Sequence, residues 1–291
     1  MNPKFPVYIV SKGRADNGLT TRALMEMGVD HFIVVEENEL QQYASGRCFG
    51  SLLVLPNKYK KEYETLDDIG FAKSTGPGPA RNFCIDHSTS LGFSHHWVMD
   101  DNIDAFHRLY KNEKYEVRTG ATLRAMEDFV LRYSNVPLAG PNYYSFAKKT
   151  DAIPPFVLNT RIYSCLFMQN GCGLRWRGRY NEDTDLSLRI LKLGLCTIQF
   201  NAFLCGKITT QRMSGGNTDD FYSVEGTKPK SEMLVSMHPD AARMVFKFGR
   251  WHHHVDYKPF KNNRLIYACE KPEKKSNNYG MKLIKIHNGD Y

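Results

Sequence analysis

The chain contains 291 residues, of which 42% are hydrophobic and 24% are charged, and its formal net charge is +8. This length allows one large domain or two small ones, and the apolar fraction supports a sizeable core. No stretch approaches the about 18 apolar residues of a membrane span, and the first residues lack the long apolar region of a signal peptide. We therefore expect a soluble, cytoplasmic protein with no membrane partner.

The cysteines and the positive charge narrow the class further. The seven cysteines are odd in number and no two form a CxxC pair, so reduced thiols fit better than a disulfide framework or a zinc knuckle. A charge of +8 is compatible with solubility alone and with a polyanionic partner such as nucleic acid. The charge by itself does not decide between the two.

The first third of the chain alternates between short apolar strands and a helix. Residues 6–10, 31–35 and 52–55 are β-rich, and residues 17–27 have helical spacing that ends at Gly28. This alternation predicts a parallel sheet with helices on its faces. Ligands of such sheets bind outside the carboxyl ends of the strands. The informative residues therefore follow the strands, and they are Ser11 to Arg14, Glu36 and Glu37, and Asp100 to Asn102 after the strand at 95–99.

A Gly/Pro-rich loop, residues 71–84, runs into the next helix. Pro79 suits the first helical position, with Gly78 before it. Arg81 and Asn82 then lie in the first turn, where exposed backbone N–H groups beside a guanidinium favour a phosphate. The alternative interpretation is an ordinary junction between a loop and a helix.

Asp100, Asp101 and Asn102 form the first candidate site. Adjacent carboxylates at a strand end repel one another. A divalent cation removes that cost through hard oxygen ligands, and it can bridge the phosphates of a nucleotide-sugar and stabilise the departing diphosphate. A simple turn is the alternative reading of the same three residues.

The second half of the chain is predicted to contain further helices and strands. Residues 120–133 form an amphipathic helix, and residues 137–147 and 161–169 read as strands. Residues 174–180 alternate like a strand, with Arg175, Arg177 and Arg179 on one face and Leu174, Trp176 and Tyr180 on the other. A helix at 183–193 follows and ends at Gly194, and residues 281–286 form a possible late strand in a Lys-rich tail.

Carboxylates crowd the first turn of the helix near residue 183. Glu182, Asp183 and Asp185 all lie there. Helix capping, the helix dipole and an ion pair between Asp185 and Arg189 account for one or two of these acids. Three acids after an arginine-rich segment indicate a site, in which a carboxylate takes a proton from an acceptor hydroxyl.

Two weaker candidates come later in the chain. Gly215 and Gly216 belong to a polar stretch, residues 214–217, in which glycines permit the hinge geometry of a lid. His252 to His254 follow a tryptophan, and a neutral imidazole there could complete the coordination of a metal. A solvated histidine run is the alternative.

These segments resemble the GT-A glycosyltransferases, in the order expected of that family. In the family a strand like PVYIVSKGR contacts the nucleotide, and one like HFIVVEE ends in an acid near the base. A segment like GPGPARN lies over the diphosphate, VMDDNI matches the D-x-D motif, NEDTDLSLR matches the start of the helix that supplies the base, and WHHHVDY offers the late metal ligand. Asn102 departs from the motif, because its third position is usually an acid.

A narrower group is more similar still, the TET-associated glycosyltransferases encoded by bacteriophages. The segments VMDDN, NEDTDLSLR, SGGNTDDFY and WHHHVDY carry this resemblance, which runs from about residue 5 to about residue 265. It implies transfer of a sugar from a UDP-sugar, such as UDP-glucose or UDP-GlcNAc, to 5-hydroxymethylcytosine in double-stranded DNA. It also implies action in the cytoplasm of an infected bacterium.

We therefore expect an α/β, GT-A-like (Rossmann-like) single domain over residues 1–291, with a mixed, mostly parallel sheet flanked by helices. Residues 1–105 form the nucleotide-sugar half, 106–265 the acceptor and catalytic half, and 266–291 a basic tail. The reaction is expected to be inverting and to need Mn²⁺ or Mg²⁺. The expected roles are donor binding by Ser11, Gly13, Arg14, Glu36, Arg81, Asn82 and Asp100; metal binding by Asp101, Asn102, His252 and His254; catalysis by Asp183 as base with Glu182; and acceptor binding by Arg175, Trp176, Arg177, Gly215 and Gly216.

Two other functions stay open at the level of sequence. A nucleotidyltransferase also places acids and metals at strand ends, although SKGRADNG is a poor match to its glycine-rich loop. A non-catalytic nucleic-acid-binding protein on a sugar-transferase fold would use the arginines of 174–180. Such a protein gains nothing from the acids of both motifs, so the sequence favours the enzyme.

Overall fold

The computed structural model describes residues 1–69, 74–148, 153–207 and 228–269. Its main sheet contains β1 (Val7–Val10), β2 (Phe32–Val35), β3 (Ser51–Val54), β4 (His95–Asp100), β5 (Ile103–Tyr110), β6 (Glu113–Glu116), β7 (Leu138–Tyr143), β8 (Phe156–Leu158), β9 (Cys165–Gln169) and β10 (Thr197–Lys207). The strand order is β3-β2-β1-β4-β9-β7-β10-β5-β6, and β8 also pairs with β10.

The sheet is mixed, and its longest run of parallel strands comes from the N-terminal part of the chain. Strands β3, β2, β1 and β4 run parallel to one another, and β10 runs parallel to β7. Antiparallel pairs join β9 to β4 and β7, and join β5 to β10 and β6. The α/β class with a mixed sheet flanked by helices is thereby confirmed.

The helices are α1 (Leu19–Glu26), α2 (Leu40–Ser45), α3 (Asn57–Lys61), α4 (Gly78–Ser90), α5 (Ala121–Val130), α6 (Glu182–Lys192) and α7 (Lys228–Met237), with short 3-10 turns η1 (Glu37–Glu39) and η4 (Lys258–Phe260). A separate hairpin of β11 (Ala242–Lys247) and β12 (Arg250–Val255) contacts α7. None of the helices in the described ranges is long and apolar enough to cross a membrane. The seven cysteines are all free thiols.

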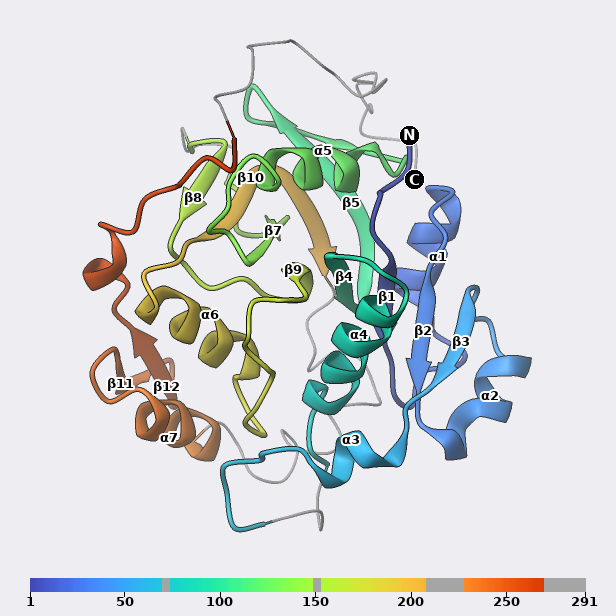
Figure 1. The fold of residues 1–291 in the computed structure, drawn as a ribbon, viewed down its shortest axis with the longest axis horizontal. Coiled ribbons are helices and arrows are strands. Elements are labelled where there is room, and N and C mark those ends of the chain that lie inside the picture. The colour runs from blue at the N-terminus through green and yellow to red at the C-terminus, as the bar shows by residue number, and fades with distance from the viewer. Residues whose placement is uncertain (70–73, 149–152, 208–227, 270–291) are drawn as a thin grey trace.

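Helices cover both faces of the sheet. Because successive side chains of a strand point to opposite faces, each strand contributes apolar residues to both layers of the core. Val7 and Ile9 of β1 pack with α1 and α5 in one apolar cluster, whereas Tyr8 and Val10 pack with α4 and α6 in another. Figure 1 shows α4 and α6 lying over one face of the sheet. With both faces covered, the polar ends of the strands at the sheet's carboxyl edge are what remains open to a ligand.

Most of the expected elements are present with ends shifted by a few residues, but the strand expected at 174–180 is wrong. This segment has no regular secondary structure and belongs to neither sheet. The amides of Gly178 and Arg179 donate to the carbonyls of Glu64 and Thr65, and the backbone of Trp176 bonds to a side chain. Periodicity alone could not show that loop and side-chain partners would satisfy this backbone. The possible strand at 281–286 lies outside the described residues.

Candidate active site

One cavity of about 340 Å³ opens at the carboxyl edge of β1, β2 and β4. Its described lining contains seven basic and five acidic side chains, so the cavity favours an anionic ligand. Nine of the residues singled out from the sequence line it, namely Ser11, Arg14, Glu36, Arg81, Asp100, Asp101, Asn102, Glu182 and Asp183. The described lining does not include Gly13, Asn82, Arg175, Trp176, Arg177, His252 or His254. Gly215 and Gly216 lie outside the described residues.

Asp100 is the last residue of β4 and binds two cationic side chains. Its Oδ1 accepts a hydrogen bond of 2.9 Å from Arg81, and its Oδ2 accepts one of 2.8 Å from Lys207 at the end of β10. The charges of Lys207 and Arg81 outweigh burial and hold the pKa of Asp100 well below its usual range. Asp100 is therefore ionised at any physiological pH.

Arg81 connects the strand end to the start of α6. Its guanidinium donates to Asp100 and, at 3.0 Å, to Glu182, and it also lies over the ring of Trp176 at 4.7 Å. The position follows from the start of α4, where Gly78 lets the helix approach Tyr63: a Cβ at this glycine would lie 1.9 Å from the tyrosine Oη. The Gly/Pro-rich loop thus brings a buried guanidinium to the cavity.

Asp101 is turned toward the end of β1. It accepts hydrogen bonds from the Ser11 hydroxyl at 2.7 Å and from the Arg14 guanidinium, and only 5% of its surface is exposed. Burial raises the pKa of the Asp101 carboxyl, while Arg14 and Ser11 act in the opposite direction. This pairing fixes the loop after β1 against the loop after β4.

The start of α6 presents Glu182 and Asp183 to the cavity. Asn181 precedes them in the left-handed conformation with φ of 56°, which turns the chain sharply into the helix. Asp183 accepts the Thr184 amide through Oδ1 at 2.7 Å, and among the described residues no hydrogen bond reaches its Oδ2. Burial, with the charge of Asp183, raises the pKa of Glu182 to about 7 against the opposing effect of Arg81.

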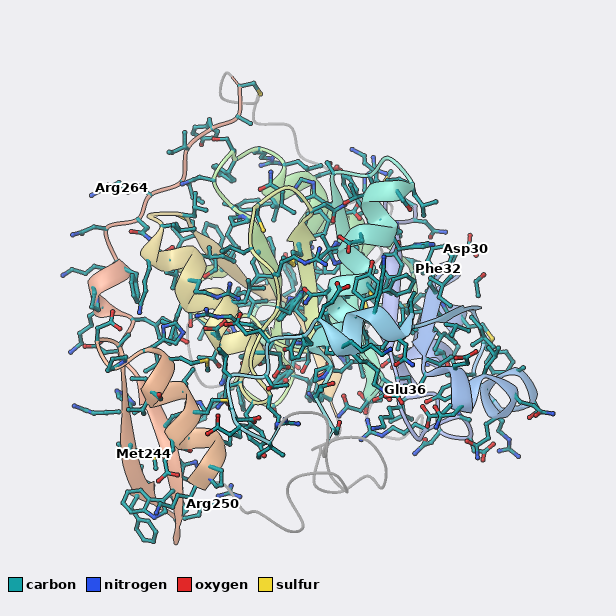
Figure 2. The ribbon with its side chains drawn as sticks, turned by 60° about the horizontal axis from the view of Figure 1, so that its bottom comes forward. Asp30, Phe32, Glu36, Met244, Arg250 and Arg264 are labelled. Carbon is teal, nitrogen blue, oxygen red and sulfur yellow. The ribbon has the colours of Figure 1, made fainter. Side chains whose placement is uncertain are left out.

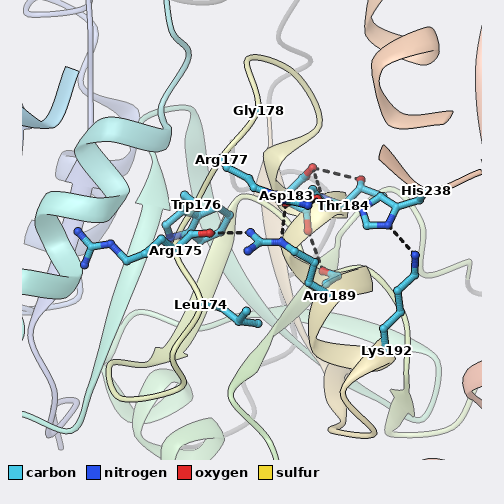
Figure 3. A network of polar contacts seen from close by, with 12 residues as sticks. Leu174, Arg175, Trp176, Arg177, Gly178, Asp183, Thr184, Arg189, Lys192 and His238 are labelled. Carbon is cyan, nitrogen blue, oxygen red and sulfur yellow. Dashed lines mark hydrogen bonds and ion pairs between the residues drawn. The ribbon is translucent and has the colours of Figure 1, made fainter. Parts of the chain in front are cut away.

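In the first turn of α6, an ion cluster around the buried Asp185 joins this helix to neighbouring segments (Figure 3). Asp185 is fully buried and accepts bonds from Arg177 at 3.2 Å, Arg189 at 2.7 Å and His238 at 2.9 Å. These partners lower the pKa of the Asp185 carboxyl despite its burial. The Arg177 side chain therefore forms an ion pair with the first turn of α6.

The idea that three arginines form one DNA-facing row is wrong. Arg175 pairs with Asp86 at 2.8 Å, and Arg179 pairs with Asp67 at 2.9 Å with its side chain fully buried. Trp176 is 1% exposed and belongs to the core. Because 174–180 is not a pleated strand, its side chains do not alternate across a sheet and each arginine has a different acidic partner.

Gly13 and Asn82 hold loops in place at the edge of the site. The amide of Gly13 donates to Glu39 at 2.7 Å. The carboxamide of Asn82 donates to the Trp176 carbonyl at 3.0 Å and accepts from its amide at 2.9 Å. Both residues therefore position neighbours of the cavity.

The histidine run lies on β12, apart from Asp101 and Asn102. Successive strand residues face opposite sides, and His253 lies within electrostatic range of Arg161 and Asp183. Burial, helped by Lys230 and Arg161, lowers the pKa of His253 to about 4, so this imidazole is neutral. His253 and His254 also border a smaller cavity of about 280 Å³ that includes Arg161.

Lys207 and Arg161 line the cavity and carry no recognisable signal in the sequence, and His253 is not distinguished there from the other histidines of its run. Lys207 ends an apolar strand without a motif. Burial lowers the pKa of its ammonium group, but the interactions with Asp100 and Tyr143 outweigh burial and leave the pKa raised. Arg161 is half-buried at the cavity near Asp183, and the charge of Asp183 outweighs desolvation and raises the pKa of the Arg161 guanidinium. His253 could have been preferred to its neighbours only if the orientation of β12 were known.

Comparison with protein-family models identifies the family of this chain. The family model described as TET-Associated Glycosyltransferase matches residues 5–216, which include β1, the loop before α4, the end of β4 and the start of α6. No curated protein matches the chain.

Proposed function

This chain belongs to the TET-associated glycosyltransferases, and from that premise we propose that it transfers a sugar from a UDP-sugar to 5-hydroxymethylcytosine in double-stranded DNA. UDP-glucose and UDP-GlcNAc are the candidate donors. The observation that carries the proposal is the cationic cavity at the carboxyl edge of the sheet, where Arg81, Asp100, Asp183 and Lys207 meet from four separate segments.

The diphosphate of the donor is proposed to lie against Arg81 and Lys207. Both cations line the cavity, and each shares its charge with Asp100. A diphosphate would accept further hydrogen bonds from the guanidinium and ammonium groups, which are strong when both partners are charged. Ser11, Arg14 and Glu36 line the part of the cavity at the ends of β1 and β2, where we place the nucleoside.

A divalent metal fits the described residues poorly. These residues contain no group of three histidine, cysteine or acidic side chains able to hold a metal ion. Both carboxylate oxygens of Asp100 bind cationic side chains, and those of Asp101 bind Ser11 and Arg14. The sequence predicts dependence on Mn²⁺ or Mg²⁺, whereas the described residues favour donor binding without a metal, and no step below passes through a metal.

Asp183 is proposed as the general base of an inverting displacement. Its Oδ2 takes the proton from the acceptor hydroxyl as the hydroxyl oxygen bonds to the anomeric carbon of the sugar. The bond from that carbon to the diphosphate breaks, and its electron pair leaves on UDP, whose charge Arg81 and Lys207 stabilise. Glu182, with its pKa near neutrality, is placed to hold the acceptor hydroxyl.

Product analysis tests this function against its rivals. Incubation with a UDP-sugar and a hydroxymethylated duplex should release UDP and add one sugar to the modified base. Release of pyrophosphate from a nucleoside triphosphate would instead identify a nucleotidyltransferase. DNA binding without turnover of any UDP-sugar would identify a non-catalytic binder.

A further inference from the structure

The tip of the β11–β12 hairpin exposes three aromatic side chains. Phe248 is 93% exposed, Phe246 is 60% exposed and Trp251 is 39% exposed. Phe246 and Trp251 face each other across the two strands with ring centroids 5.3 Å apart. Figure 2 shows the hairpin, marked by Met244 and Arg250, at the end of the molecule opposite Phe32.

Phe248 occupies a turn position that suits a different residue. It has φ of 53° and Gly249 has φ of 72°, so the two-residue turn has positive φ at both positions. Such turns strongly favour Asn-Gly, because a bulky residue with positive φ is strained. A phenylalanine that is both strained and exposed contributes little to folding, and its presence points to a role outside the fold.

The charged residues of the hairpin are all basic. Between Ala242 and Val255 these are Arg243, Lys247 and Arg250, with no acid among them. No ion pair joins any of the three to a described residue, in contrast to the arginines of 174–180. Exposed rings flanked by uncompensated cations are the combination that binds nucleic acid, through stacking on bases and contact with phosphates.

One end of β12 lies near the candidate active site, and the other end carries the turn with the exposed aromatic side chains. Strand alternation places Trp251 and His253 on the same face of β12. His253 borders a small cavity together with Arg161 and Tyr163, and these two residues also line the main cavity that contains Asp183. His253 is five positions along the chain from Phe248, which corresponds to about 16 Å at the rise of a strand. A duplex advances by about 3.4 Å per base pair, so the tip is within reach of DNA about five base pairs from a nucleotide at Asp183.

We propose that the β11–β12 hairpin is a DNA-binding element in which Phe248 inserts between two neighbouring base pairs of the duplex, about five base pairs from the target nucleotide, and stacks on their bases. Lys247 and Arg250 contact the flanking phosphates. This inference rests on the proposed DNA acceptor. The charge of the hairpin argues for a polyanion and against a second copy of the chain, because two like-charged tips repel each other. The hairpin supplies the acceptor contact that the arginines of 174–180, each paired with an acid of the protein, do not.

The test compares Phe248→Asn with Phe49→Asn in affinity for a hydroxymethylated duplex of about 20 base pairs, two helical turns. Asparagine suits the turn, so Phe248→Asn should fold at least as well as the parent. Its affinity should nevertheless fall about ten-fold, the loss expected for one stacked base. Phe49 is 48% exposed and lies in the connection between α2 and β3, outside the hairpin, and its replacement should leave DNA affinity unchanged. Titration with UDP, made in parallel, reports whether the donor cavity of each variant is intact.

Two further measurements sharpen the result. Lys247→Ala with Arg250→Ala should reduce the salt dependence of DNA binding by up to about two phosphate contacts, whereas Arg22→Ala, an exposed arginine on α1, should not. Shortening the duplex to about three base pairs beyond the target on the side that the hairpin contacts should weaken the parent and not Phe248→Asn.

The hairpin proposal is overturned if Phe248→Asn binds the long duplex as tightly as the parent. It is also overturned if the variant keeps its DNA affinity and changes instead the oligomeric state or the binding to anionic lipid vesicles. A parent that hydrolyses UDP-sugars and binds no DNA would refute the DNA acceptor itself, and the hairpin proposal with it. The DNA affinity of the parent therefore distinguishes failure of the hairpin proposal, in which the parent still binds DNA, from failure of the DNA acceptor, in which it does not.

Discussion

Lys207 Nζ lies 2.8 Å from Asp100 Oδ2, which places an ammonium group of the protein at the strand end where the sequence predicts a metal ion. The two residues come from β10 and β4, 107 positions apart. Mutual attraction raises the pKa of Lys207 and lowers that of Asp100, so both are charged throughout the physiological range. A fixed cation next to the proposed diphosphate site leads to the first prediction.

Lys207→Met should weaken UDP binding about ten-fold, because a hydrogen bond to a charged group is lost. The parent should bind UDP equally well with Mn²⁺ and with EDTA. The variant frees Asp100 Oδ2 and should gain affinity when Mn²⁺ is added. Isothermal titration measures the UDP affinity of the parent and of Lys207→Met, each with Mn²⁺ and with EDTA. Lys61→Met, which replaces an exposed lysine on α3, is the matched control. Loss of UDP affinity of the parent in EDTA would favour a metal at this site instead.

Glu182 should make the stability of the protein depend on pH. Its pKa is raised to about 7 in the folded state, so its contribution to stability is complete below its ordinary pKa and is lost as the pH rises through 7. The Tm of Glu182→Gln relative to the parent should therefore increase between about pH 5 and pH 8. One pKa unit corresponds to about 1.4 kcal/mol, so we expect an increase of at least about 4 °C.

Thermal unfolding across that pH range checks the prediction. Glu26→Gln, which removes an exposed carboxylate on α1, is the control and should show no comparable trend. A difference in Tm that stays constant with pH would show that the Glu182 carboxylate is not held in a buried, proton-favouring environment.

Arg179→Ala should damage stability and leave the salt dependence of DNA binding unchanged. The guanidinium is fully buried and bonds to both oxygens of Asp67, so its removal strands a carboxylate and costs about 3 kcal/mol. Urea unfolding measures the loss. A stable variant with a reduced salt slope would mean that Arg179 reaches DNA after all.

The sequence allowed the parallel half of the fold and the residues at its strand ends to be predicted. Asp100, Asp101 and Ser11 meet because parallel strands present their carboxyl ends at one edge. Arg81 was predicted from the start of a helix after a Gly/Pro-rich loop. These inferences need only local patterns and one rule about sheets.

The partners of these residues could not be predicted in the same way. Lys207 reaches Asp100 only through the antiparallel pairing of β10 with β5. The segment 174–180 has the periodicity of a strand, yet the acids that pair with Arg175 and Arg179 lie 89 and 112 positions away. Contacts of this range depend on how the whole chain packs, and no local pattern reports them.

The central claim is tested most directly by the rate at which a hydroxymethylated duplex gains a sugar, measured by mass spectrometry for the parent and for Asp183→Asn. The account predicts that the parent adds one sugar per modified base and releases UDP. It predicts that Asp183→Asn binds UDP normally and transfers at least about 100-fold more slowly, the loss expected when a general base is removed. Transfer by Asp183→Asn near the parent rate would contradict the assignment of the base, and no transfer by the parent from any UDP-sugar would contradict the proposed function.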